Sequence, residues 1–372
     1  MAAHSHHYWP DVTFDAQAQA WTDAALHADH KWAHVFGGIM PDVRQHIARI
    51  LHLPDPGSIV FAQNTHEFVV RLLSCLPTDK PAHVLTTDSE FHSFDRQIRR
   101  LEEDGSISVT RIATKPFENF PARFAAAAAD KKIDMVFFSH VFFNSGFVVS
   151  DLAQIVNAVQ NPQALVVVDG YHGFMALPTD LTAIADRAFY LAGGYKYAMA
   201  GEGACFMHCP SGFGARPRNT GWFAGFGNLQ STQASQGGQV AYGHDGMRFA
   251  GATADVSGLY RMRAVFEWLQ RENITVQDIH THAHRLQDVF LDGLNRMQNA
   301  ALPVSCLMVN ENKKRGNFLA FKTPRAADIC HILEQHGIIT DHRGDCLRFG
   351  FGPYHDMADI EKLLEVIKAY VR

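Results

Sequence analysis

The residues best placed to do chemistry lie between positions 164 and 203. One apolar run ends in Asp169, with His172 three residues later, and a second apolar run leads through two glycines to Tyr195 and Lys196. A carboxylate at the end of a buried strand lies at the edge of an α/β sheet where ligands bind. A lysine in a glycine-flanked turn after such a strand can be held away from water. Its pKa then falls, and the neutral amine becomes a nucleophile for imine formation.

Pyridoxal phosphate needs this pair of side chains. A lysine holds the aldehyde of the cofactor as an imine, and a carboxylate keeps the pyridine nitrogen protonated, so that the ring can accept electrons. Taken singly, Asp169 is typical of a turn or helix cap, and Lys196 is typical of a surface charge. Their combination at the ends of two successive apolar runs predicts a pyridoxal-phosphate site in which both residues are catalytic.

The order of motifs from about Ser58 to Tyr354 resembles the class-V aminotransferase group of fold-type-I pyridoxal-phosphate enzymes, and within it the kynureninase branch. Kynureninases have a serine where this chain has Gly194. The matching segments are Asp169-Gly-Tyr-His172, Gly194-Tyr195-Lys196-Tyr197, Gly221-Trp222-Phe223 and Leu347-Arg348-Phe-Gly-Phe-Gly-Pro353-Tyr354.

The resemblance implies a role for each matched residue. Lys196 would bind the cofactor covalently, and Asp169 would pair with its ring nitrogen. His172 would lie against the cofactor, Tyr195 would bond its phosphate, and Trp222 would belong to the same cofactor site.

The same resemblance assigns Arg348 to the substrate, where it would bind the α-carboxylate of an amino acid. Physical chemistry agrees with this assignment, because a planar guanidinium makes two parallel bonds to a carboxylate and a lysine cannot. The alternative is a structural ion pair with Asp341 or Asp345, which lie nearby in the sequence.

The phosphate of the cofactor is expected near Asn64 and Thr65, which follow a short strand and open a helix. Free N–H groups and the helix dipole favour an anion at such a position. An ordinary capped helix would have the same sequence, and the resemblance is what places the phosphate-binding turn here. It also places Phe91 over the cofactor ring; otherwise Phe91 would be a hydrophobic staple for the next helix.

Two departures from the resemblance affect the substrate rather than the cofactor. Relatives often carry an asparagine after a His-Val pair, where it bonds the phenolic oxygen of the cofactor, and this chain has Phe142 there. Either Asn144 substitutes for it or no residue does. The segment 248–253 matches the substrate-pocket region of kynureninases only loosely.

The elements that must position these residues alternate regularly between strand and helix. Strands are expected over 58–63, 83–87, 107–112, 133–140 and 164–169, and helices over 65–75, 91–103, 121–129 and 151–159. The strands are apolar on both faces, as in a parallel sheet covered by helices. With the resemblance, this pattern predicts a fold-type-I α/β protein with a mainly parallel seven-stranded sheet in a large domain and a small α+β C-terminal domain. The expected division is an N-terminal helical segment over 1–40, the large domain over 41–300 and the small domain over 301–372.

Composition narrows the functional class. The chain has 372 residues, 47% of them hydrophobic and 19% charged, with a net charge of −5. This balance is typical of a globular protein and argues against a nucleic-acid partner. No apolar run reaches the roughly 18 residues of a membrane span, and the first ten residues do not resemble a signal peptide. Six scattered cysteines favour a reducing cytoplasm.

Histidine and cysteine clusters offer weaker alternatives. The histidines at 4, 6 and 7 and at 280, 282 and 284 lack a partner at metal-ligand spacing, so no metal is expected and they are interpreted as solvated. A cysteine desulfurase needs a mobile nucleophilic cysteine. Cys330 in an apparent helix and Cys346 in an apparent strand do not fit that role, and Cys205 and Cys209 are expected to be buried.

These patterns predict a pyridoxal-phosphate enzyme that acts on an α-amino acid, with a class-V aminotransferase activity placed first. The alternative is a kynureninase-type hydrolase that cleaves the Cβ–Cγ bond of an aromatic γ-keto amino acid. A cofactor-binding protein without catalysis is a third possibility, which the presence of Lys196, Asp169 and Arg348 argues against. The resemblance implies a homodimer, with the glycine-rich segment 225–246 reaching the partner.

Overall fold

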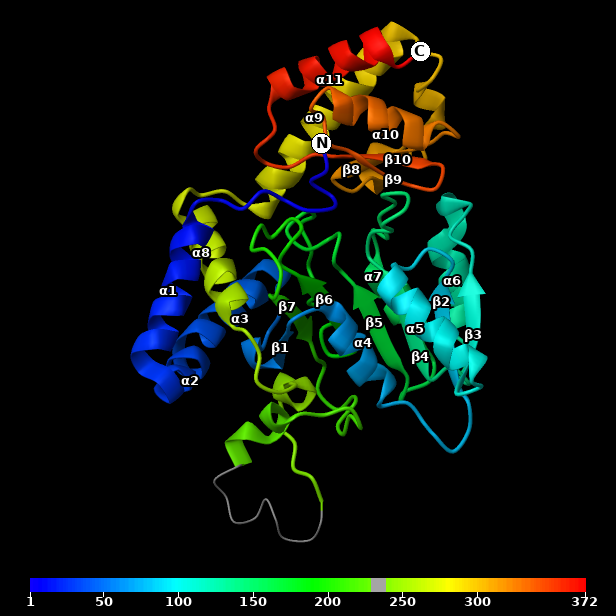
Figure 1. The fold of residues 1–372 in the computed structure, drawn as a ribbon. Coiled ribbons are helices and arrows are strands. Elements are labelled where there is room, and N and C mark those ends of the chain that lie inside the picture. Colours follow the sequence, from blue (N-terminus) through cyan, green and yellow to red (C-terminus); the bar gives the residue numbers. More distant parts are fainter. Residues whose placement is uncertain (229–238) are drawn as a thin grey trace.

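A seven-stranded sheet forms the larger part of the computed structural model, which describes residues 1–228 and 239–372 (Figure 1). The strand order is β1-β7-β6-β5-β4-β2-β3. Neighbours from β6 to β3 are parallel, and only β7 runs antiparallel to both of its neighbours. The prediction of a mainly parallel seven-stranded α/β sheet is therefore confirmed. The strands are β1 (Ile59–Ala62), β2 (Ala82–Thr87), β3 (Ile107–Ile112), β4 (Met135–Ser139), β5 (Leu165–Asp169), β6 (Ala188–Gly193) and β7 (Cys205–His208).

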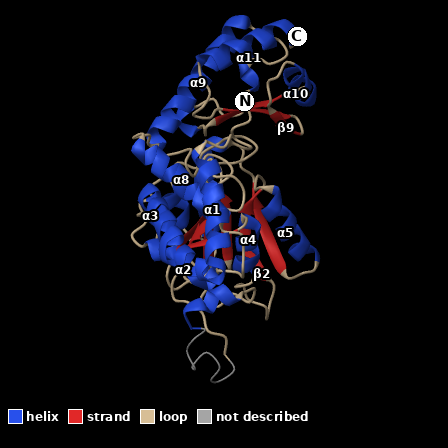
Figure 2. Cartoon of the chain, turned by 60° about the vertical axis from the view of Figure 1, so that its left-hand side comes forward, coloured by secondary structure: helices blue, strands red, loops and turns tan. Residues whose placement is uncertain are grey.

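Helices cover both faces of this sheet (Figure 2). Strand β4 shows why, because successive side chains of a strand point to opposite faces. Val136 and Phe138 pack in the hydrophobic cluster that contains residues of α3 (Met40–Leu51), α6 (Phe120–Ala128), α7 (Leu152–Val156) and α8 (Ser257–Arg271). Met135 and Phe137 pack in a second cluster, with residues of α4 (Thr65–Leu73) and α5 (His92–Glu103). Burial on both faces explains the continuous apolar runs of the sequence.

A small antiparallel sheet lies beyond the carboxyl edge of the large one (Figure 1). Its order is β8-β10-β9, with β8 at Phe318–Lys322, β9 at Asp341–Arg343 and β10 at Cys346–Gly350. Helices α9 (Val276–Met297), α10 (Ala326–Gln335) and α11 (Met357–Tyr370) share one hydrophobic cluster with this sheet. Since α9 belongs to that cluster, the packing of the small sheet begins before residue 300. The domain boundaries given above stay a prediction.

The N-terminal helices differ from the expected pattern. The sequence predicts helices over 14–34 and 42–52 that are closed or separated by Gly37, Gly38 and Pro41. Instead, the chain continues through α1 (Val12–His27), a 3₁₀ turn, α2 (Lys31–His34) and a π-helical turn over Val35–Ile39 into α3. Val35 and Ile39 are buried. Continued helical hydrogen bonds satisfy the backbone of this buried segment, and that requirement outweighs the preference of glycine for breaks.

Two further observations bear on the environment of the protein. In the described residues, no helix is both long and apolar enough to cross a membrane. All six cysteines are free thiols, and Cys205, Cys209 and Cys346 are buried.

Candidate active site

Strands β5 and β6 bring the two central residues to one edge of the large sheet. The strands are parallel neighbours, with Asp169 opposite Leu191, so the turn that follows β6 returns Lys196 toward Asp169. Glycine is required at position 193, the last residue of β6, because a Cβ there would collide with the hydroxyl of Tyr171 and the thiol of Cys205. The carboxylate and the amine therefore meet because two buried strands end side by side.

A cavity of about 450 Å³ lies at this edge. Seven of the nine residues that the sequence singles out line it, and Trp222 and Arg348 do not. The seven are Asn64, Thr65, Phe91, Asp169, His172, Tyr195 and Lys196. The cavity thus collects residues from four separate parts of the chain.

The amine of Lys196 is enclosed by aromatic and imidazole groups. The residue is 5% exposed, and its Nζ lies 2.7 Å from Nε2 of His172. The ring centroids of Tyr171, Phe91 and Tyr195 lie 4.8, 5.4 and 5.7 Å from Nζ. Burial lowers the pKa of Lys196, against the opposing effect of Asp169. A larger fraction of the amine is therefore neutral and nucleophilic at physiological pH.

Asp169 presents a carboxylate to the cavity. Its Oδ1 accepts a hydrogen bond from the backbone N–H of Tyr171 at 2.9 Å. Burial raises the pKa of Asp169, while the Tyr171 N–H and the charge of Lys196 lower it. A cation facing this carboxylate from within the cavity would stabilise its ionised form.

The N-terminus of α4 forms another wall. The helix begins at Thr65, and the side chain of its N-cap, Asn64, accepts a hydrogen bond from the N–H of Glu67 at 3.1 Å. The Asn64 side chain therefore caps the helix, as its alternative interpretation expects. The helix end still opens on the cavity through Thr65 and His66, and its dipole favours an anion there.

Phe91 lies at the N-cap of α5 and lines the cavity. Its ring packs edge-on against Phe143, another lining residue, with centroids 5.4 Å apart. The position suits an aromatic side chain that covers a flat ligand. The sequence analysis does not single out Phe143, because a phenylalanine in an apolar segment carries no chemical signature of a ligand site.

Ser139 is a second lining residue that the sequence analysis missed. It is paired in register with Asp169 across β4 and β5, and its Oγ donates to the buried carboxyl group of Glu90 at 2.5 Å. Burial raises the pKa of Glu90 to about 8, with the charge of Asp169 acting in the same direction. The sequence does contain a signal for Ser139, since this polar residue, like Asp169, ends an apolar strand.

The position of the missing asparagine, Phe142, and its possible substitute, Asn144, both lie outside the cavity lining. Phe142 is fully buried in the core, where it packs against Phe120 and Phe147. Asn144 donates from Nδ2 to Oγ of Ser89 at 3.1 Å and is not among the residues that line the cavity. Neither side chain therefore takes the place of the asparagine within this cavity.

Trp222 and Arg348 lie outside the cavity lining. Trp222 is 44% exposed and packs against Phe223 and Phe226 in a 3₁₀ segment over Trp222–Asn228. Arg348 is buried and donates hydrogen bonds to Asp341 and to the carbonyl of Phe143. Both residues stay predictions as ligand contacts, and Arg348 also forms the structural ion pair proposed as its alternative.

The interpretation of the histidines as solvated is wrong for several of them. His4, His7 and His284 are buried, because the N-terminal segment pairs with β10 and α9 packs on the small sheet. His280 is partly buried, with Nδ1 2.8 Å from Oδ1 of Asn317. Among the residues that the structure describes, no group of three or more His, Cys, Asp or Glu side chains could hold a metal ion.

Residues 10–363 match the family model "Aminotransferase class-V", and the chain belongs to this family. It is 20% identical over 341 residues to a probable cysteine desulfurase of Vibrio cholerae, covering 87% of this chain and 80% of the relative.

Two solved structures share the fold. The complex of the cystine C–S lyase C-DES with its reaction product cysteine persulfide has a TM-score of 0.81 and 19% identity, covering 99% of this chain and 96% of the other. The Escherichia coli cysteine desulfurase CsdA has a TM-score of 0.79 and 16% identity, covering 99% and 93%. These comparisons do not confirm the kynureninase branch.

The cofactor of this chain is pyridoxal 5′-phosphate, and the residues present fit it. A buried amine, a carboxylate and a helix N-terminus face one cavity, which matches the aldehyde, the ring nitrogen and the phosphate of the cofactor. In addition, Nδ1 of the cavity-lining His172 is buried without a hydrogen-bond partner among the described residues.

Proposed function

We propose that this class-V enzyme acts on an α-amino acid and transfers its amino group to a keto acid. The observation that carries the proposal is the amine of Lys196, buried in the cavity and hydrogen-bonded to His172. Transamination requires a base that removes a proton from Cα and returns it elsewhere, and a single enclosed lysine suffices for this. Bound pyridoxal phosphate supplies the electron sink that makes the Cα proton removable.

The residues around the cavity each have a defined role in the proposed reaction. Lys196 Nζ accepts and returns the proton, and its lowered pKa favours the neutral form that can accept it. His172 holds that amine in one orientation through its Nε2. Asp169 supplies the negative charge that favours a protonated ring nitrogen. The aromatic rings around Nζ exclude water from the proton transfer.

Carbon–sulfur bond cleavage is the second candidate, because the relatives described above are named for it. The described cysteines do not support a desulfurase that uses a protein thiol as nucleophile. Cys205 lines the cavity, but burial raises its pKa to about 12. Cys346 bonds to the carbonyl of Asn144, and burial raises its pKa to about 11. A lyase without such a thiol remains compatible with the site.

The kynureninase alternative has less support. It needs an aromatic pocket for the substrate, and the aromatic residues within or beside the matched motifs that could form its walls are Tyr171, Trp222, Phe223 and Phe226. Only Tyr171 lines the cavity, and the other three pack against one another.

Product analysis tests these candidates. The holoprotein is incubated with a panel of amino acids, with and without keto acids, and the products are identified by mass. Amino-group transfer that requires the keto acid supports transamination. A keto acid with ammonia and a reduced sulfur product, formed from cysteine or cystine alone, would replace it with lyase activity. Alanine and an aromatic acid from kynurenine would instead indicate the hydrolase, and a spectral change without product would indicate loss of catalysis.

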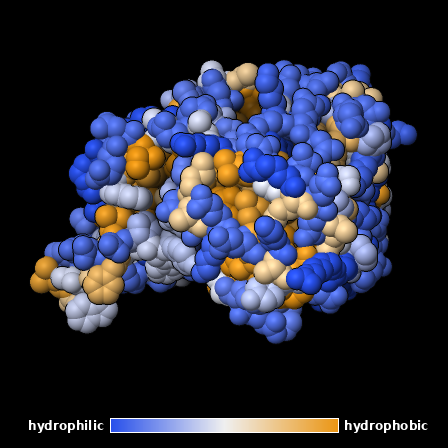
Figure 3. Space-filling view, turned by 90° about the horizontal axis from the view of Figure 1, so that it is seen from above, coloured by the Kyte–Doolittle hydropathy of each residue, from blue (hydrophilic) through white to orange (hydrophobic). Residues whose placement is uncertain are grey.

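We further propose a homodimer in the cytoplasm. Helix α1 exposes three large hydrophobic side chains, Phe14, Trp21 and Leu26, each more than 70% exposed. Figure 3 shows hydrophobic side chains at the edge of the molecule where Figure 1 places α1. Exposed apolar patches favour a protein partner, and six free thiols suit a reducing compartment. Sedimentation and activity measured on dilution test the dimer, and a fully active monomer would contradict it.

A further inference from the structure

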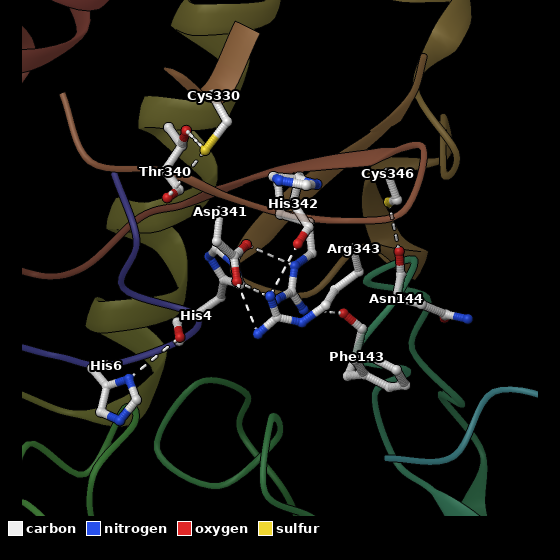
Figure 4. Close-up of polar contacts among 12 residues, drawn as sticks. His4, His6, Phe143, Asn144, Cys330, Thr340, Asp341, His342, Arg343 and Cys346 are labelled. Atoms are coloured by element: carbon white, nitrogen blue, oxygen red, sulfur yellow. Dashed lines mark hydrogen bonds and ion pairs between the residues drawn. The ribbon is translucent and has the colours of Figure 1, made fainter. Parts of the chain in front are cut away.

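One carboxylate in the small sheet collects the groups around Arg348. Asp341 on β9 pairs in register with Arg348 on β10. Its oxygens accept bonds from Nε of Arg348 at 2.8 Å and from Nη2 of the same guanidinium. Nε2 of His4 lies 2.7 Å from Oδ1, and the guanidinium of Arg343 lies 3.6 Å from Oδ2 (Figure 4). Because a carboxylate only accepts hydrogen bonds, His4 donates from Nε2.

Backbone pairing between the N-terminal segment and β10 fixes the position of His4. Ala2 forms a parallel bridge with Gly350, whose N–H donates to the carbonyl of Met1 at 2.9 Å. Gly350 must be a glycine, because a Cβ there would collide with the backbone nitrogen of His4. The His4 side chain is fully buried and stacks on Phe318, with ring centroids 5.1 Å apart.

The same segment continues to the cavity. The N–H of His7 donates to the carbonyl of Tyr195 at 3.2 Å, and the ring of His6 stacks on the ring of Tyr195 at 4.7 Å. Tyr195 precedes Lys196 and lines the cavity. The first residues of the chain therefore connect the small sheet with the wall of the candidate active site.

The hydrogen bonds that Arg348 makes show which edge of its guanidinium lacks an acceptor among the described residues. A guanidinium has five N–H bonds. Asp341 takes the Nε and one Nη2 hydrogen, and the carbonyl of Phe143 takes one Nη1 hydrogen at 2.6 Å. Among the residues that the structure describes, no other acceptor bonds this side chain, so one hydrogen remains on each of Nη1 and Nη2. Two N–H groups at the outer edge of a guanidinium can bind one carboxylate in a bidentate manner.

We propose that His4 and Asp341 are positioning residues that hold the guanidinium of Arg348 so that only its Nη1–Nη2 edge is free for the carboxylate of an amino-acid substrate. The N-terminal segment thereby completes the substrate site. The inference rests on the proposed amino-acid substrate and on the carboxylate-binding role that the family resemblance implies for Arg348, and it adds what orients that residue.

Two small probes test the proposal without knowledge of the substrate. Aminooxyacetate carries a carboxylate and O-methylhydroxylamine lacks one, and both displace Lys196 from the cofactor. The nitrogen of the probe forms the new C=N bond to the aldehyde carbon, the C=N bond to Lys196 breaks, and the lysine leaves as its amine. The rate constants, followed by absorbance in the holoprotein, give a preference ratio for the carboxylate probe.

We expect the ratio to fall about 10- to 150-fold in Arg348→Lys, the range of a charge-assisted contact. In His4→Leu and Asp341→Asn it should fall about 3- to 10-fold, with the rate of O-methylhydroxylamine unchanged. His4→Gln restores a donor and should recover most of the ratio. His331→Leu, on an exposed face of α10, is the matched control. If Asp341→Asn does not fold, as judged by melting temperature, the two His4 variants decide.

The outcomes distinguish the positioning role of His4 and Asp341 from the carboxylate-binding role of Arg348. A ratio that falls in Arg348→Lys but not in the His4 and Asp341 variants would overturn the positioning role and leave the function of Arg348 intact. A higher ratio in Asp341→Asn would mean that Asp341 competes with the ligand, and loss in His4→Leu without rescue by His4→Gln would mean that packing alone matters. Both results overturn the proposal. An unchanged ratio in Arg348→Lys would remove the carboxylate function itself.

Discussion

The Lys196–Asp169 pair in the cavity and the group around Arg348, outside the cavity lining, are built in different ways. Lys196 and Asp169 come from two adjacent parallel strands of one sheet, and each residue follows directly from its own strand. The group around Arg348 is assembled from β9, β10, the loop after β4 and the N-terminal segment. The first arrangement depends on local strand geometry. The second depends on how distant parts of the chain dock, so it should be more sensitive to changes outside the cavity.

Loss of Lys196 should have the largest effect. Lys196→Ala removes both the covalent anchor and the base, so turnover should fall by about 10²–10⁴-fold, the usual contribution of a general base. Borohydride reduction of the wild-type holoprotein, followed by peptide mass mapping, should locate the cofactor on Lys196. Lys322→Ala, on an exposed side chain, is the control. Cofactor found on another lysine would contradict the assignment.

Asp169→Asn should retain part of the cofactor and lose about 10- to 1,000-fold in turnover. A neutral amide removes an opposite charge that shifts a neighbouring pKa by roughly 1–3 units. Cofactor content by absorbance and turnover should be measured on the same preparation. Asp186→Asn, on an exposed turn residue, controls for loss of a surface charge. Near-normal turnover in Asp169→Asn would show that the carboxylate has only a structural role.

Arg348→Lys tests the group around Arg348. A carboxylate-binding role predicts a higher KM and a kcat/KM lower by about 10- to 150-fold, with fold and cofactor retained. A purely structural pair with Asp341 predicts a lower melting temperature and unchanged kinetics. Arg343→Lys is the matched variant, because Arg343 approaches the same carboxylate and is largely exposed. If only Arg343→Lys raises KM, the carboxylate is bound by Arg343.

Glu90 should affect the stability of the fold rather than turnover. Its pKa rises from an ordinary 4.5 to about 8 on folding, mainly through burial. Between these values the folded protein keeps a proton that the unfolded chain has released. The stabilisation is therefore complete below about pH 4.5 and is lost as the pH rises toward 8, at up to roughly 1.4 kcal/mol per unit.

Glu90→Gln cannot ionise and should not lose this increment. Urea unfolding at pH 5, 6.5 and 8 should show the variant gaining stability relative to wild type as the pH rises. The exposed Glu365→Gln should follow the wild type. A difference between Glu90→Gln and wild type that does not depend on pH would show that Glu90 is already ionised in the folded protein.

Residues that lie at the ends of buried strands could be predicted from the sequence, whereas residues brought together by distant segments could not. Asp169 and Lys196 were found because each ends or follows a buried strand, and parallel neighbours bring such ends together. Ser139 obeys the same rule and could have been found with it. Phe143 and His4 could not, because Phe143 contacts Arg348 and His4 contacts Asp341, residues hundreds of positions away in the chain, and no local pattern marks these contacts.

The sequence by itself determined the α/β class, the order of strands and helices and the pair of residues at the edge of the large sheet. Apolar runs and their periodicity report burial, and burial of both strand faces dictates a covered parallel sheet. Only the tertiary structure decided that His4 and His7 are interior groups and that Arg348 is held by Asp341. These contacts arise when the N-terminal segment pairs with β10 and the small sheet faces the large one. Which distant segments meet depends on packing summed over the whole chain, and the residues at position 4 and position 341 carry no local sign of it.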